Sequence, residues 1–111
     1  MKSSEEGQLL RVFVGESDRW HGKPLYEAIV LKAREMGIAG ATVLRGIMGY
    51  GAASTIHTSK ILRLSEDLPV IIEIVDNPQI ISQLLPEIES MVQEGLVTLE
   101  NVSVLQYRTG K

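Results

Sequence analysis

Two short stretches of the sequence contain residues that could hold a ligand. Gly49, Tyr50 and Gly51 follow a run of apolar residues, and glycines let backbone N–H groups approach an anion closely. This motif predicts either a cradle for a phosphate or sugar or a tight turn at the end of a strand. Arg108 carries a guanidinium fork that suits phosphate, or it is a solvated arginine.

Three further cations could contribute to the same site. Arg45 lies just before the glycines, and it either reaches a phosphate or pairs with Glu73 on the neighbouring strand, which we favour. Lys60 and Arg63 follow in a long connection and could close over an anion. Charged side chains in such a connection are more often solvated, so we give these two less weight.

The two histidines offer a second kind of chemistry. His21 and His57, with Asp18, could bind a divalent metal, because imidazole and carboxylate suit such ions. They are not at helical ligand spacing, so local hydrogen bonds are the interpretation that we favour. Hydroxyl residues lie near His57 within residues 54–59, but a nucleophile needs a base and an orienting group in fixed geometry. We therefore predict no catalytic residues and a protein that is not an enzyme.

Composition limits the function classes further. The 111 residues carry a net charge of -3, one Phe, three Tyr, one Trp and no Cys. The absence of cysteine excludes disulfides and thiolate sites, and fits a cytoplasmic location. The charge and the few aromatic residues argue against nucleic-acid binding. The apolar runs are too short to insert into a membrane.

The periodicity of apolar residues predicts the elements that position these groups. Short β-rich runs with flanking glycine or proline predict four strands, at residues 9–14, 41–48, 70–75 and 96–107, the last interrupted near residues 100–101. Helical spacing predicts two helices. The first is opened by Pro24 and capped by Gly37, and the second runs from Asn77 and Pro78, through Pro86, to Gly95.

The order of these elements predicts an α+β, ferredoxin-like β-α-β-β-α-β fold. Four antiparallel strands form one sheet, and both helices lie on one of its faces. Residues 1–7 are expected to be a flexible tail and residues 8–111 a single domain, with a long loop at about 49–68. The strand at 41–48 is apolar on both faces. Something must therefore cover the second sheet face, and the simplest cover is another subunit.

Several motifs carry a resemblance to known families. Residues 37–43 (Gly-Ile-Ala-Gly-Ala-Thr-Val), the Gly-Tyr-Gly at 49–51 and the end Tyr-Arg-Thr-Gly-Lys at 107–111 resemble the PII signal-transduction proteins. Residues 21–27, 45–51 and 65–70 are more similar still to the PII-like family catalogued as domain of unknown function one-ninety. The likeness covers about residues 9–107.

The resemblance implies a homotrimer that binds an adenine nucleotide in the clefts between its subunits. In PII proteins the glycine-rich loop base and the C-terminal arginines contact the nucleotide, and the long loop grips a target such as a membrane transporter or channel. The expected ligand contacts here are Thr42, Arg45, Gly49, Tyr50, Gly51 and Arg108.

The sequence departs from the PII pattern at two places. Gln106 replaces the first C-terminal arginine, and residues 93–98, where PII proteins have a basic loop, contain one acid and no lysine. ADP or AMP is therefore easier to accommodate than ATP. A divalent-metal-binding or metal-tolerance trimer is the alternative function, and a nucleotide hydrolase ranks last.

Overall fold

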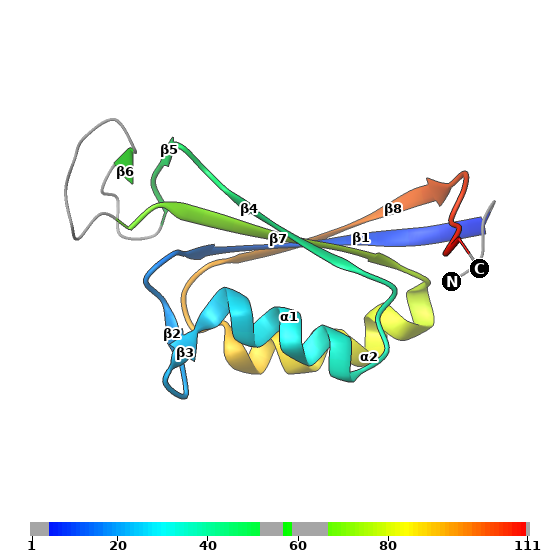
Figure 1. Cartoon of the computed structure of the whole chain (residues 1–111), viewed down its shortest axis with the longest axis horizontal. Coiled ribbons are helices and arrows are strands. Elements are labelled where there is room, and N and C mark those ends of the chain that lie inside the picture. Colours follow the sequence, from blue (N-terminus) through cyan, green and yellow to red (C-terminus); the bar gives the residue numbers. More distant parts are fainter. Residues whose placement is uncertain (1–4, 52–56, 59–66, 111) are drawn as a thin grey trace.

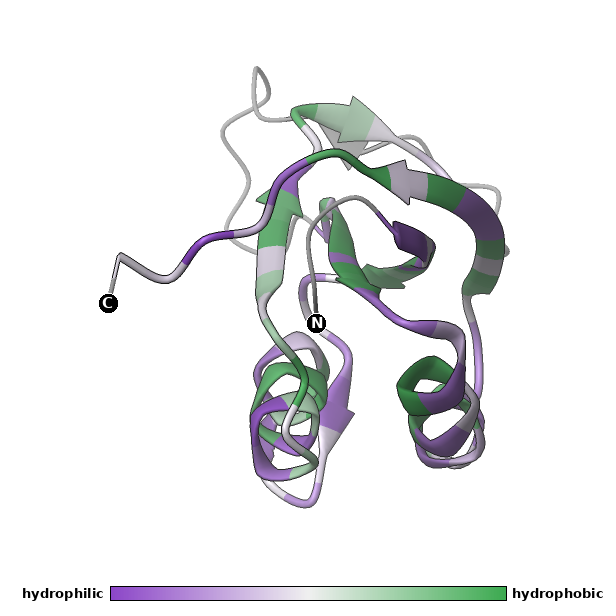
Figure 2. Cartoon of the chain, turned by 90° about the vertical axis from the view of Figure 1, so that its right-hand side faces the viewer, coloured by the Kyte–Doolittle hydropathy of each residue, from purple (hydrophilic) through white to green (hydrophobic). Residues whose placement is uncertain are grey.

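A computed structural model describes residues 5–51, 57–58 and 67–110. Its main sheet has four antiparallel strands in the order β4-β7-β1-β8 (Figure 1). These strands are β1 (Glu5–Gly15), β4 (Ala41–Arg45), β7 (Pro69–Asp76) and β8 (Leu96–Val104). The helices α1 (Leu25–Glu35) and α2 (Pro78–Met91) lie side by side on one face of the sheet (Figure 2). The predicted ferredoxin-like fold is therefore confirmed.

The core lies between this sheet face and the two helices. Alternate residues of β1 and β7 point to the helices, because successive strand residues point to opposite faces. Leu10 and Val12 from β1 and Ile72 and Ile74 from β7 are fully buried there. Ile81, Leu84 and Ile88 supply the apolar stripe of α2.

The helix ends follow the predicted signals to within a few residues. Pro24 directly precedes α1 and belongs to a short strand, whereas it was expected at the first helical position. Gly37 has a φ of 80°, and the N–H of the following Ile38 donates to the carbonyl of Ala33 at 3.0 Å, which closes the helix. The side chain of Asn77 accepts the N–H of Ile80 at 2.9 Å, as an N-cap does.

The second helix is shorter than the sequence indicated. It continues past Pro86, which lies on its exposed side, and ends at Met91. Gly95 lies beyond this end, where the chain turns into β8. A Cβ on Gly95 would lie 2.5 Å from the carbonyl oxygen of Phe13, so glycine is needed here for close backbone approach.

Two predicted strands and part of the predicted loop need correction. The expected strand at 41–48 is divided at Gly46, whose N–H donates to the carbonyl of Pro69 at 2.7 Å. Beyond this break, β5 (Met48–Gly49) pairs with β6 (His57–Thr58), inside the predicted loop. The last strand is not interrupted at residues 100–101, and it ends at Val104, before residue 107.

The first strand also begins earlier than expected. Residues 5–7 of the predicted tail pair with residues 102–104 of β8, so they belong to the sheet. A further small hairpin, β2 (Arg19–Trp20) with β3 (Lys23–Pro24), lies in the segment that joins β1 to α1. The remaining residues of the long loop, 52–56 and 59–66, lie outside the described residues.

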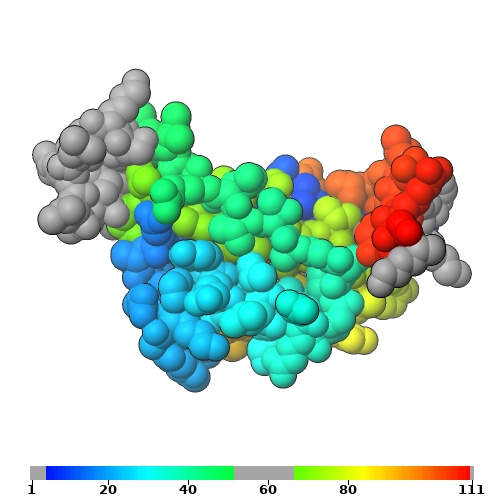
Figure 3. Space-filling model, viewed as in Figure 1, coloured from blue at the N-terminus to red at the C-terminus, as the bar shows by residue number. Residues whose placement is uncertain are grey.

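No helix covers the other face of the sheet among the described elements, and we call it the open face (Figure 2). Leu9, Phe13, Ile71 and Val75 point to it, because they alternate with the buried residues. In the space-filling view, a hollow lies between the β4–β5 end of the molecule and the C-terminal segment (Figure 3). The apolar character of this second face agrees with the sequence prediction.

Candidate functional site

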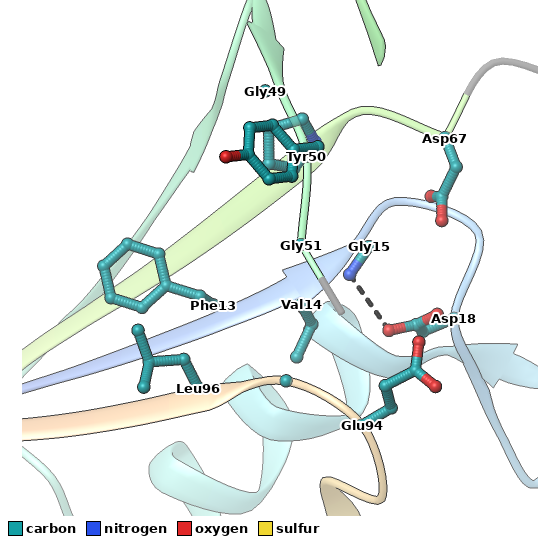
Figure 4. Close-up of a pocket in the computed structure, with 12 residues that line it drawn as sticks. Phe13, Val14, Gly15, Asp18, Gly49, Tyr50, Gly51, Asp67, Glu94 and Leu96 are labelled. Carbon is teal, nitrogen blue, oxygen red and sulfur yellow. Dashed lines mark hydrogen bonds between the residues drawn. The ribbon is translucent and has the colours of Figure 1, made fainter. Parts of the chain in front are cut away.

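A pocket of about 270 Å³ lies at the end of the sheet where β1 ends and β7 and β8 begin (Figure 4). Its described lining combines glycines, apolar side chains and carboxylates. The lining residues are Phe13, Val14, Gly15, Asp18, Gly49, Tyr50, Gly51, Asp67, Pro69, Glu94, Gly95 and Leu96. We therefore treat this pocket as the candidate ligand site of the chain.

The predicted glycine motif forms one wall of this pocket. A Cβ on Gly49 would lie 3.0 Å from Cγ of Pro69, so the small residue allows β5 to approach the start of β7. Tyr50 is 68% exposed. Neither Gly49 nor Gly51 has a positive φ, so these glycines are not required by an unusual backbone conformation. Gly49 allows close packing against Pro69, and Gly51 leaves the pocket wall without a side chain.

Two aspartates shape the turn at the end of β1. The carboxylate of Asp18 accepts the N–H of Gly15 at 2.9 Å, and that of Asp67 accepts the N–H of Ser17 at 2.7 Å. A Cβ on Gly15 would lie 2.5 Å from Asp67 Oδ2. Glycine at position 15 therefore lets Asp67 close over the turn.

The described lining is acidic. Asp18, Asp67 and Glu94 contribute three carboxylates, and the described residues of the lining include no Lys, Arg or His. Glu94 lies at the exposed rim, beside Gly95. The sequence analysis identified Glu94 only as part of an unusual lysine-free stretch and Asp18 only as a metal candidate. It missed Asp67 and Phe13, because the strand register that brings them together is not visible in a linear pattern.

The predicted pairing of Arg45 with Glu73 is wrong. Arg45 forms its ion pair with Glu16, and it is not among the residues that line the pocket. Glu73 instead accepts a hydrogen bond from Nε of Arg11 at 2.9 Å, while Nη1 of Arg11 donates to Glu100 at 2.8 Å. Arg11 lies directly opposite Glu73 in the β1–β7 register, whereas Arg45 lies opposite Val70.

Arg11 is a residue that the sequence analysis missed. It lies at the centre of the open face, between Leu9 and Phe13 along β1. The hydrogen bond to Glu73, followed by the charges of Glu73 and Glu100, raises the pKa of Arg11 above its ordinary value. The available signal was a lone arginine that interrupts an apolar alternation.

Thr42 and Arg108 lie away from the pocket within one chain. Thr42 is opposite Glu73 on the open face. Arg108 follows the end of β8, and Val104 at that end pairs with Glu5, the first residue of β1. The pocket lies at the other end of β1, roughly 33 Å away along eleven strand residues. One chain therefore does not bring Arg108 to Gly49 or Gly51 (Figure 1).

The metal site considered for His21, His57 and Asp18 can be compared with the structure only at His21 and Asp18. His21 stacks on Trp20, with ring centroids 4.3 Å apart and an angle of 13° between the planes. His21 has a φ of 48°, and the turn is closed by Arg19, which donates to the carbonyl of Gly22 at 2.6 Å. Among the described residues, no group of three His, Asp or Glu side chains could hold a metal ion. The side chain of His57 lies outside the described part, as do Lys60 and Arg63.

The antiparallel sheet with two helices on one face, and a pocket at the root of a long connection, define a ferredoxin-like α+β protein. The model of the family DUF190, described as "Uncharacterized ACR", matches residues 7–104. The chain belongs to this family, as the resemblance predicted. Neither described helix is long and apolar enough to cross a membrane.

Proteins of similar sequence support this family membership. A UPF0166 protein of Aquifex aeolicus (strain VF5) is 42% identical over 98 residues, which cover 88% of this chain and 92% of the relative. A UPF0166 protein of Methanocaldococcus jannaschii is 34% identical over 105 residues, which cover 94% and 96% of the two chains. The match extends over almost the whole of both relatives.

Solved structures show the fold. The PII-like protein CPII from Thiomonas intermedia K12, bound to ADP, AMP and bicarbonate, matches with a TM-score of 0.69 and 14% identity, over 91% of this chain and 90% of that chain. A PII-like signalling protein from Thermus thermophilus matches with a TM-score of 0.65 and 14% identity, over 91% of each chain. At this identity the likeness concerns the fold alone.

Proposed function

We propose that this protein is a PII-like regulator that binds an adenine nucleotide (ADP, AMP or ATP) and contacts a target protein through residues 49–68. The single observation that carries the proposal is the place of the pocket. Gly49 to Gly51 begin the long connection and Asp67 ends it, and both ends line the pocket. A ligand there would touch both ends of the segment that is proposed to meet the target.

The pocket has features that suit such a ligand. Glycines and the apolar residues Phe13, Pro69 and Leu96 offer a surface for a flat base, and the carboxylates of Asp18 and Asp67 can accept hydrogen bonds from hydroxyl groups. A protein of similar fold, CPII, was solved with ADP and AMP. Together these observations support an adenine nucleotide as the ligand class.

We further propose that the site is completed between subunits of a homotrimer. Arg108 lies at the opposite end of the sheet from the pocket, so its contribution requires a second copy of the chain. The apolar open face, to which Thr42 also belongs, provides the surface through which the copies associate. Thr42, Arg45, Gly49, Tyr50, Gly51 and Arg108 remain the proposed ligand-contacting set.

The mechanism follows from differential binding. A ligand shifts a conformational equilibrium only by its difference in affinity for the two states. Because the ligand would contact Gly51 and Asp67 together, it favours conformations of the connection that keep these ends in place. A target such as a membrane transporter or channel would then meet one state more often. The proposal is a binding function, with no catalytic residue assigned.

The metal alternative has less support among the described residues. Asp18, the expected carboxylate ligand, already accepts the N–H of Gly15, and His21 is stacked on Trp20. Metal titration of the purified protein would be the direct comparison. Uptake that is lost in a double substitution of His21 and His57 would favour this alternative over nucleotide binding.

The ligand is tested by isothermal titration calorimetry with ATP, ADP and AMP, using two matched variants. Gly51 lines the pocket, Gly40 does not, and a Cβ at either position would meet no atom of the described residues within 4 Å. Gly51→Phe should weaken binding about tenfold or more by filling the pocket mouth, while Gly40→Phe should leave it unchanged. Absence of binding by all three nucleotides at millimolar concentration would refute the proposal.

The shared site is tested by mixing variants. Arg108→Ala and Gly51→Phe should each weaken binding when pure. When the two are denatured and refolded together, some interfaces combine an intact pocket with an intact arginine, so part of the binding should return. Native mass spectrometry should give a mass of three 12.2 kDa chains. Recovery that is absent in verified mixed trimers would place all ligand contacts within one chain.

A further inference from the structure

The charges of the pocket bear on which nucleotide it accepts. Asp18, Asp67 and Glu94 line it together, from the β1–β2 turn, the residues before β7 and the residues before β8. The first two carboxylates accept backbone N–H groups, which orient them but do not cancel their charge. No hydrogen bond or ion pair to the side chain of Glu94 is found among the described residues.

Among the described residues, the nearby cations do not neutralise these acids. Arg45 is engaged by Glu16, and Arg11 is engaged by Glu73 and Glu100 on the open face. Of the two arginines in the proposed ligand-contacting set, Arg45 is offset by Glu16. Among the described residues of the proposed trimer, a neighbouring Arg108 would therefore bring one uncompensated positive charge against the three negative ones of the lining. A chain of phosphates placed here therefore meets a negative potential that grows less favourable with each added phosphate.

From this geometry we infer that the pocket selects against phosphate charge, and that Glu94 is the residue that sets this preference. The inference rests on the proposed nucleotide function and adds an order of affinity to it: adenosine and AMP bind more tightly than ADP, and ADP more tightly than ATP. The base and sugar occupy the pocket, and the phosphates extend past its rim. Glu94 lines the pocket with an exposed side chain, so in this arrangement it lies closest to the outgoing phosphates.

Position 94 suits a charge substitution. Glu94 is exposed and precedes β8, so its replacement removes no core contact. The neighbouring Gly95 is the residue that the backbone requires, because a Cβ there would meet the carbonyl oxygen of Phe13. Glu89, exposed on α2 and not part of the pocket lining, offers the matched control with the same change in net charge.

The experiment is calorimetry with adenosine, AMP, ADP and ATP, without divalent cations, at low and high ionic strength. In the native chain, affinity should fall about threefold or more for each added phosphate at low salt, and the steps should shrink at high salt, because salt screens charges. Glu94→Lys should raise the ATP-to-AMP affinity ratio by about tenfold, and Glu94→Gln by about threefold. Glu89→Lys should leave the ratio unchanged.

The outcomes separate this inference from the function on which it rests. ATP binding as tightly as AMP in the native chain, or equal shifts of the ratio in Glu94→Lys and Glu89→Lys, would overturn the inference and leave nucleotide binding intact. Absence of binding by all four compounds, adenosine included, would overturn both. Circular dichroism of each variant verifies that the fold is retained.

Discussion

The two faces of the sheet use alternate residues of the same strands, yet they differ in how they are completed. Ile72 and Leu10 point to the helices and are 0% exposed, whereas their neighbours Ile71 and Leu9 point to the open face and remain partly exposed. The helix-covered face is finished within one chain. The open face has similar apolar residues and no cover of its own among the described elements.

The polar groups of the two faces differ as well. Asp76, the buried charged residue of the helix-covered side, is 1% exposed and is held by backbone N–H groups. Arg11 lies among partly exposed neighbours and bridges two carboxylates. Folding thus gives each carboxylate oxygen of Asp76 a hydrogen bond within the chain, while the open face retains a charged centre among apolar residues. We interpret this difference as one between a core and a surface for association between copies.

The largest effect is expected from comparing two adjacent isoleucines of β7. Ile72→Ala removes a fully buried side chain and should lower the free energy of unfolding by about 3 kcal/mol. Ile71→Ala removes a partly exposed one and should cost about 1 kcal/mol at low protein concentration. Urea denaturation followed by circular dichroism measures both.

Protein concentration makes this comparison sharper. If copies associate through the open face, the cost of Ile71→Ala should grow with concentration, because association stabilises only the folded state. The cost of Ile72→Ala in the interior should include no such extra contribution. Equal dependence of the two variants on concentration would contradict the assignment of the open face as the association surface.

The next largest loss of stability is expected at Asp76, which is hydrogen-bonded to the segment after α1 and to the residue before α2. Its Oδ2 accepts the N–H of Ala39 at 2.9 Å, after α1, and its Oδ1 accepts the N–H of Asn77 at 2.7 Å, before α2. Asp76→Ala leaves both part-buried donors without this partner and should cost about 2 kcal/mol. Asp76→Asn keeps one acceptor oxygen and should cost about half as much. Thermal unfolding measures both variants, and equal costs would mean that the second hydrogen bond contributes nothing.

The elements were predictable because local patterns determine them. A short β-rich run after Pro69 predicted β7, and the N-cap at Asn77 and the glycine at position 37 placed helix ends to within a few residues. The break at Gly46 was not predictable, since it depends on the close approach of Pro69 from a distant part of the chain. The uninterrupted β8 was missed because Glu100 and Asn101 look like a break in the linear sequence. In the sheet, Gln8 lies opposite Asn101, and Arg11 reaches Glu100 diagonally from the neighbouring strand.

The candidate site was predictable only in part, because most of its walls come from segments that are distant in the sequence. Gly49, Tyr50 and Gly51 form a compact motif, and they do line the pocket. Its other walls come from the ends of β1 and from the starts of β7 and β8, which meet only through the sheet register. Register also decided the partner of Glu73, because it places Arg11 opposite and Arg45 three residues away along β7.

The smallest effect is expected at Arg11, whose network should matter less for the stability of a single chain than the buried Asp76. Arg11→Gln removes two ion pairs from a partly exposed position, where water and salt weaken them. It should lower the unfolding temperature less than Asp76→Ala does, and the difference from the native chain should shrink as salt is added. Lys32→Gln, which removes two longer exposed contacts to Glu35 and Glu87 on the helical side, is the matched control.

The pH dependence of Arg11→Gln follows from the direction of its pKa shift. Glu73 and Glu100 raise the pKa of Arg11, and a raised pKa gives stability that is complete below the unfolded value and lost only as the pH rises through the folded one. The difference in unfolding temperature between the native chain and Arg11→Gln should therefore stay constant from about pH 7 to about pH 10. A difference that disappears within this range would show that another group governs the network. A cost that instead exceeds that of Asp76→Ala at high protein concentration would make Arg11 part of a covered interface, with its charges shielded from water by a second copy.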